Sequence, residues 1–300
     1  MMNRLFCFGT GFTAQTLIKR LDPAKWHFAG TCRTPSKAIG LTQDGIDAYV
    51  FDGSRPIEDA RSVFANISHV LVSIPPDVDG DRDRALMHHQ SFLAGAAPHL
   101  RWIGYLSTVG VYGDHDGGWI SETTPPAPVS RRGEARLAAE RQWQAFGRKT
   151  GVPVQIFRLP GIYGPGRNAL TALKRGKTRS IIKPGQVFNR IHVADLAAVL
   201  ERAMAAPDKG PVFNVVDDEP APPQDVTAYA ARLMGLPAPE EVDFDSAEMS
   251  PMARSFYGEC KRVHNTRIKQ ELGAQLAYPD YRAGLDALWR EEPEAEGGAR

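Results

Sequence analysis

The amino-acid sequence predicts an α/β protein with a doubly wound parallel sheet and a smaller C-terminal lobe interleaved with the last strands. Three observations support this prediction. Short apolar segments alternate with segments of helical periodicity along most of the chain. The apolar segments are apolar at successive positions, which is typical of parallel strands covered by helices on both faces. The first of them ends in a glycine-rich turn, Gly9-Thr10-Gly11.

Strands are expected where an apolar run is bounded by turn residues. The first run, residues 5–8, stops at Gly9 and is too short for the apolar core of a signal peptide, so it is interpreted as a buried strand. In order, strands are expected at residues 5–8, 26–32, 46–51, 69–74, 102–106, 154–157, 190–193 and 212–216.

Helices are expected where apolar residues recur every three to four positions. Ala14, Leu17, Ile18 and Leu21 share one face of the first helix. The strongest helical pattern covers residues 134–146 and is followed by Gly151, a typical end signal. The remaining helices are expected at residues 36–43, 57–64, 82–97, 170–175, 194–205 and 224–234.

Composition excludes several classes of protein. There are 36 Lys and Arg residues against 35 Asp and Glu, so the chain lacks the basic excess of a nucleic-acid-binding protein. No apolar stretch is long enough to span a membrane. Three cysteines, odd in number and far apart, argue against a disulfide framework and favour a reducing cytoplasm. No metal site is expected; the expected partner is a small molecule, and the oligomeric state stays open.

The glycine-rich turn has the chemistry of a dinucleotide site. Residues 9–14 fit the pattern G-x-G-x-x-G/A between a strand and a helix. Gly9 permits the tight turn, Gly11 lets the backbone approach a pyrophosphate, and Ala14 lets the helix pack closely on the strand. The free N–H groups at the start of the helix would face the phosphates. Predicted cofactor contacts here are Gly9, Thr10, Gly11, Phe12, Thr13 and Ala14.

The end of the second strand indicates which dinucleotide binds. An NAD site usually has an acidic residue about 20 residues after the loop, where it binds the ribose 2′-hydroxyl. This chain has no acid there; it has Arg33, with Ser36 and Lys37 just beyond. A guanidinium matches a 2′-phosphate, so NADP is expected, with NAD as the alternative. Asp52 follows the third strand and is either an adenine contact or a helix-capping residue.

Several later segments resemble one known family in sequence and in order. They are residues 106–113 (LSTVGVYG), Glu122 with Pro125, 137–140 (LAAE), 158–166 (RLPGIYGPG), 190–197 (RIHVADLA) and 214–216. Over about residues 4–235 the chain is similar to extended short-chain dehydrogenases, the NAD(P)-dependent epimerase/dehydratase family. The resemblance implies a Rossmann sheet, a nicotinamide cofactor and a substrate cleft beneath a small lobe. It also implies that Ser73, Pro75, Ser107 and Pro160 contact the cofactor.

The chain departs from that family at the catalytic pair. Family members carry Tyr-x-x-x-Lys near the start of the helix that contains residues 137–140, and the alignment places Arg132 and Arg136 at these positions. Arg136 keeps a positive charge and can still hold the nicotinamide ribose. Arg132 cannot take over proton transfer, because a guanidinium does not release a proton at neutral pH. The sequence therefore resembles an atypical, Tyr-less branch of the family.

Two other hydroxyls are candidates for the chemistry. Thr108 lies at the carboxyl end of a strand, where open α/β sheets bind ligands, or it simply caps the following turn. Tyr112, four residues on, is the nearest phenol that could act as an acid, with packing as the alternative. The predicted catalytic residues are therefore Thr108, Tyr112 and Arg136.

Domain organisation and function follow from these motifs. We expect a dinucleotide-binding domain from residues 1–164 and 186–216, a small substrate lobe from residues 165–185 and 217–290, and a disordered tail from 291–300. The expected function is that of an NADP-binding oxidoreductase or epimerase-like protein with a degenerate Tyr-x-x-x-Lys site and a small-molecule substrate, either sugar-like or another small compound. The alternative is a non-catalytic NADP-binding redox sensor or partner-binding module, which the two arginines at the catalytic positions favour.

Overall fold

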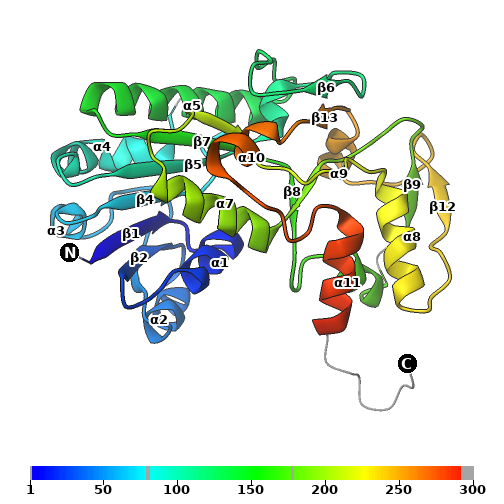
Figure 1. Ribbon diagram of the computed structural model, residues 1–300, viewed down its shortest axis with the longest axis horizontal. Coiled ribbons are helices and arrows are strands. Elements are labelled where there is room, and N and C mark those ends of the chain that lie inside the picture. The colour runs from blue at the N-terminus through cyan, green and yellow to red at the C-terminus, as the bar shows by residue number, and fades with distance from the viewer. Residues whose placement is uncertain (1, 79–81, 177–178, 292–300) are drawn as a thin grey trace.

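The central sheet has seven strands, all parallel, in the spatial order β11-β7-β5-β4-β1-β2-β3 (Figure 1). The chain is represented by a computed structural model that describes residues 2–78, 82–176 and 179–291. From the central β1 the chain adds β2 and β3 on one side and then β4, β5, β7 and β11 on the other. The doubly wound sheet predicted from the sequence is therefore confirmed. The strands are β1 (Asn3–Phe8), β2 (Trp26–Cys32), β3 (Asp47–Val50), β4 (His69–Val72), β5 (Trp102–Thr108), β7 (Val154–Leu159) and β11 (Val212–Asn214).

Helices cover both faces of this sheet, and each face has its own apolar cluster. Leu5 and Cys7 of β1 point into one cluster, whereas Phe6 and Phe8 point into the other. This is why the strand is apolar at successive positions. One face is covered by α1 (Phe12–Arg20), α2 (Pro35–Gln43), α7 (Val193–Ala205) and α10 (Thr266–Leu272), and the other by α3 (Ala60–Phe64), α4 (Arg84–Ala96) and α5 (Arg131–Thr150). Among the described residues, no helix has both the length and the apolar character to cross a membrane.

A small lobe lies beside the carboxyl ends of the strands (Figure 1, right). Its helices α6 (Ala169–Lys174), α8 (Pro223–Leu233) and α11 (Tyr281–Glu291) share a third apolar cluster. The short strands pair as β8 (Gly161–Tyr163) with β10 (Arg190–His192), β9 (Ser180–Ile182) with β12 (Glu241–Asp243), and β6 (Trp119–Ile120) with β13 (Arg262–Val263). The remaining elements are the 3₁₀-helix η1 (Val109–Tyr112) and α9 (Pro251–Phe256).

The expected lobe boundary at residues 217–290 differs from the structure in one segment. Helix α10 packs against α7 and β11, and its residues Ile268 and Leu272 belong to the apolar cluster on one face of the large sheet. These two residues are four positions apart and so present one apolar stripe to the sheet. The chain therefore leaves the large domain after β11 and returns to it at β13 and α10. A disordered tail is expected at residues 291–300; the structure places Glu291 at the end of α11, and residues 292–300 lie outside the described residues.

Asp217, which follows β11 where the chain leaves the sheet, is a buried carboxylic acid. Its side chain is 1% exposed, and one carboxyl oxygen accepts the N–H of Glu219 at 3.3 Å. The other oxygen has no hydrogen-bond partner among the described residues. Burial raises the pKa of Asp217 to about 8; Arg190 opposes this rise, whereas Asp218 and Asp280 add to it.

We expect Asp217 to make the protein less stable as the pH rises from about 4 to about 8. Across this range the unfolded chain has lost the proton that the folded protein keeps, so the free energy of unfolding falls by about 1.4 kcal/mol per pH unit from this group. Asp217→Asn removes the pH effect, because an amide group does not titrate. The substitution is otherwise conservative, since the amide oxygen can still accept the N–H of Glu219. Urea unfolding of both proteins at pH 5, 6 and 7 measures the difference, with the exposed Asp208→Asn as the control. A stability difference that stays constant with pH would contradict the prediction.

Candidate cofactor and substrate site

The glycine turn is held against β2 and β4. Gly9 has φ +89°, and a Cβ there would lie 2.7 Å from Ile74 Cγ2 and 2.8 Å from Ser73 Oγ. The N–H of Gly9 donates to Thr31 Oγ1 at 2.8 Å, and Thr10 Oγ1 donates to the Thr31 carbonyl at 3.1 Å. Both the backbone angle and the close approach require glycine at position 9.

The N-terminus of α1 is open. Gly11 is its N-cap, no side chain caps the helix, and the first turn holds no acidic residue. A Cβ built on Gly11 meets no atom within 4 Å, although Gly9 two residues earlier is tightly packed. Ala14 is fully buried against the sheet. Free N–H groups beside open space fit a pyrophosphate, so the backbone of residues 9–14 fits a dinucleotide.

The end of β2 presents basic side chains to solvent. Arg33, Ser36 and Lys37 are exposed at the start of α2, which Thr34 caps by accepting the N–H of Lys37 at 3.4 Å. Within the described ranges, no carboxylate forms an ion pair with Arg33 or Lys37. Asp52 is exposed, and hydrogen bonds from the side chain and backbone of Ser54 lower its pKa.

Two of the predicted cofactor contacts bond instead to the protein. Ser73 Oγ donates to the carbonyl of Gly9 at 2.6 Å, so this hydroxyl supports the glycine turn. Ser107 is 5% exposed, and its Oγ donates to Glu140 Oε1 at 2.5 Å. Pro75 is exposed just beyond β4. Pro75 is exposed and Ser73 is half-buried, so both have surface that a cofactor can reach, whereas Ser107 is buried.

Glu140 and Arg158 form an ion pair beneath the ends of β5 and β7. Their side chains are 2% and 6% exposed, and two hydrogen bonds of 3.1 and 2.7 Å join them. The guanidinium of Arg158 also lies 4.6 Å from the centre of the Tyr112 ring. Through Glu140, α5 is therefore bonded to Arg158 of β7 and to Ser107 of β5. These contacts lie next in sequence to Thr108 and one helical turn from Arg136.

A cleft of about 650 Å³ opens between the large domain and the small lobe. Its wall on the large domain comes from η1, the first turns of α5 and the turn after β7. The lobe side of the cleft consists of Arg167, residues 187–190, α9 and the segment that follows it. Three predicted site residues line this cleft: Thr108, Arg136 and Pro160. None of residues 9–14 lines this cleft. The turn at Gly164, three residues beyond the lining residue Gly161, approaches the glycine turn, since a Cβ on Gly164 would lie 3.2 Å from the ring of Phe12.

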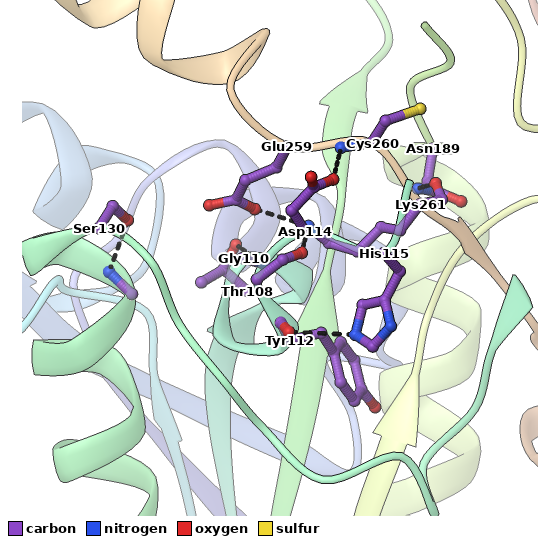
Figure 2. A network of polar contacts seen from close by, with 12 residues as sticks. Thr108, Gly110, Tyr112, Asp114, His115, Ser130, Asn189, Glu259, Cys260 and Lys261 are labelled. Carbon is purple, nitrogen blue, oxygen red and sulfur yellow. Dashed lines mark hydrogen bonds and ion pairs between the residues drawn. The ribbon is translucent and has the colours of Figure 1, made fainter. Parts of the chain in front are cut away.

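Thr108 caps the turn that follows it and also lines the cleft. Its Oγ1 accepts the N–H of Gly110 at 3.1 Å and caps η1 (Figure 2). Its hydroxyl proton has no acceptor in the described part of the chain, so it can still donate to a ligand in the cleft.

Tyr112 does not reach the cleft. Its side chain is fully buried, and its hydroxyl donates to Asn214 Oδ1 at 2.7 Å. Burial raises the pKa of this phenol. The 3₁₀-turn of η1 directs Val111 and Tyr112 into an apolar cluster. The position of Tyr112 therefore does not support a role as an acid. It supports the alternative role in packing.

Arg132 and Arg136 both line the cleft from one face of α5. Arg136 donates to the Leu106 carbonyl at 2.6 Å. Arg132 reaches across to α9, where it lies 3.5 Å from Ser255 Oγ and 5.8 Å from the centre of the Phe256 ring. The two positions at which the family resemblance expects Tyr and Lys are thus brought together in the cleft, as two arginines.

Glu259 and Lys261 also line the cleft. Lys261 is 5% exposed, donates to the carbonyl of Gly113, and lies 2.6 Å from Glu259 Oε2 (Figure 2). Asn189 fixes this segment, because it donates to the Lys261 carbonyl and accepts the N–H of Val263. Neither charged residue stands in a motif, and no sequence signal pointed to them.

Comparisons with known proteins show which family and which structures the chain resembles. Residues 91–216 match the model of the NAD dependent epimerase/dehydratase family. A structure described as that of a functionally unknown conserved protein from Silicibacter pomeroyi DSS is 50% identical, with a TM-score of 0.86, over 97% of this chain and 99% of that one. Protein YeeZ of Escherichia coli is 27% identical over 93% of this chain and 97% of its own length. UDP-glucuronic acid 4-epimerase from Bacillus cereus, solved in complex with NAD, is 19% identical with a TM-score of 0.75 over 96% of each chain.

The parallel sheet, the glycine turn and the cleft at the carboxyl ends of β5 and β7 define a Rossmann-fold protein of the dinucleotide-binding class. Over residues 91–216 the chain is similar to the NAD dependent epimerase/dehydratase family, whose model matches that part of it.

Proposed function

We propose that this chain is an NADP-dependent oxidoreductase or epimerase that acts on a small, sugar-like substrate without the Tyr-x-x-x-Lys pair of the epimerase/dehydratase family. The observation that supports the proposal most is the open N-terminus of α1 at Gly11, with Arg33 exposed at the neighbouring strand end. The first feature suits a pyrophosphate and the second a 2′-phosphate.

A bound nicotinamide would supply the hydride donor or acceptor. Around it, Pro160 would form one wall and Arg136 would hold the ribose while anchored on the Leu106 carbonyl. Groups in the cleft would exchange protons with the substrate. The candidates are the Thr108 hydroxyl, the Tyr257 phenol and the Glu259–Lys261 pair. Tyr257 comes from the segment after α9, and burial raises its pKa, which keeps the phenol protonated and able to donate.

A non-catalytic NADP sensor remains the second candidate. The observation that favours it is the replacement of both family catalytic positions by Arg132 and Arg136. Binding of NADPH, followed by a search for hydride exchange with a panel of sugar-derived ketones and aldehydes, separates the candidates. An enzyme transfers label from deuterated NADPH to a carbonyl compound. A sensor binds NADPH and NADP⁺ with different affinities and transfers none. Absence of binding to either form would contradict both candidates.

We expect Arg33→Asp to reverse the cofactor preference. The wild type should bind NADPH about ten- to a hundredfold more tightly than NADH, because charge-assisted hydrogen bonds to the 2′-phosphate contribute about 1.5–3 kcal/mol each and exposure holds them to the low end. The aspartate repels that phosphate and accepts from a free ribose hydroxyl. Calorimetric titration with both cofactors measures the change, and the exposed Arg61→Asp on α3 is the charge-matched control. Equal affinities in the wild type would overturn the NADP assignment.

A further inference from the structure

The charges that line the cleft are strongly unbalanced. Its lining contains five cationic residues and a single carboxylate, Glu259, although the chain as a whole has a net charge of only +1. Glu259 is already paired with Lys261 at 2.6 Å. Arg190 donates to the carbonyls of Phe188 and Ala221, so the protein itself uses part of its guanidinium. The lining arginines that the protein uses least are therefore Arg132, Arg136 and Arg167.

The guanidinium groups of these three arginines have more N–H donors than the protein uses. Each guanidinium carries five N–H donors. Arg136 has one acceptor, the Leu106 carbonyl, and Arg132 has one distant acceptor, Ser255 Oγ at 3.5 Å. Within the described ranges, none of the three forms an ion pair with a carboxylate. Arg132 and Arg136 are also four residues apart on α5, a spacing at which like charges repel each other.

We propose that the cleft holds a substrate by an oxyanion, a phosphate or a carboxylate, that binds to the guanidinium of Arg132 beside Arg136. The resemblance expects a proton-carrying tyrosine at position 132; the residue present instead is a permanent cation facing a cleft. Planar N–H groups match the oxygens of an anion in pairs, and the anion relieves the repulsion between neighbouring cations. Phe188 and Tyr257, packed edge to face at 5.2 Å, provide an apolar wall for the rest of the molecule.

This inference rests on the proposed function for its sugar-like probes. The probes are glucose 6-phosphate, glucuronate and glucose, which share one sugar frame and carry a phosphate, a carboxylate or no anion. Each is titrated calorimetrically into the protein saturated with NADPH. We expect at least one of the two acids to bind and glucose to bind at least tenfold more weakly; the tighter acid identifies the anion.

Arg132→Gln should weaken the tighter acid about tenfold or more, and Arg132→Lys should restore part of that loss. Position 132 is exposed, so both variants should fold. Arg141→Gln, which removes an exposed charge elsewhere on α5, should leave binding unchanged. NADPH affinity is measured for every variant. If NADPH does not bind the wild type, the proposed function fails. If NADPH binds but neither acid does, or if glucose binds as well as both acids, or if Arg132→Gln binds like the wild type, the anion site is wrong.

Discussion

Gly11→Val is expected to abolish dinucleotide binding while leaving the fold intact. The space beside the Gly11 Cα is empty in the protein, so the new side chain meets no neighbour and costs little stability. That same space is where a pyrophosphate must approach the N–H groups at the start of α1, and the valine methyl groups would fill it. Nicotinamide fluorescence during titration with NADPH measures the loss, and thermal unfolding verifies the fold.

Gly95→Val is the matched control for this substitution. Gly95 lies in α4, and its Cβ would also meet nothing within 4 Å. This variant should bind NADPH like the wild type. A folded Gly11→Val protein with unchanged NADPH affinity would show that the cofactor does not bind at this turn.

Glu140→Leu is expected to cause the largest loss of stability from any single change discussed for this protein. It leaves the guanidinium of Arg158 buried without its partner, and breaking a buried ion pair in this way costs about 3–5 kcal/mol. The substitution also removes the acceptor of Ser107 Oγ. Urea unfolding measures the effect, and the exposed Glu134→Gln, on the same helix, should change stability by about 0.5 kcal/mol or less.

The double variant Glu140→Leu with Arg158→Met separates two explanations of that loss. If the unpaired charge causes it, removing the charge should recover a large part of the lost stability. If the double variant is less stable than Glu140→Leu alone, the packing of these side chains matters more than the pairing of their charges.

Features that depend on neighbouring residues could be predicted from the sequence. The glycine turn is one, because the strand, the turn and the helix that form it are contiguous at residues 3–20. The strands of the sheet are another, because burial on both faces leaves a continuous apolar run. Helix α5 starts at Arg131, three residues earlier than expected, because Ser130 caps it by accepting the N–H of Gly133. That first turn brings Arg132 to the cleft.

Features that depend on distant residues could not be predicted in this way. Lys261 reaches the cleft only because β13 pairs with β6 and Asn189 holds the segment in place. No local pattern encodes such a contact. The sequence predicts that Tyr112 could act as an acid, because it follows Thr108 by four residues in a strand-end motif. The 3₁₀-turn instead carries its ring under the strand ends, where Arg158 and Asn214 enclose it.

The return of α10 to the sheet has a consequence for how the protein acquires its fold during synthesis. A ribosome completes β11 well before it makes α10, and the intervening residues 215–265 include the greater part of the lobe. Until α10 emerges, the apolar surface that α7 and β11 offer to Ile268 and Leu272 faces water. The nascent cofactor domain is therefore open to aggregation or chaperone binding over this interval. For the same reason a fragment that ends at residue 216 would be a poor minimal cofactor-binding unit, although it contains every strand of the sheet.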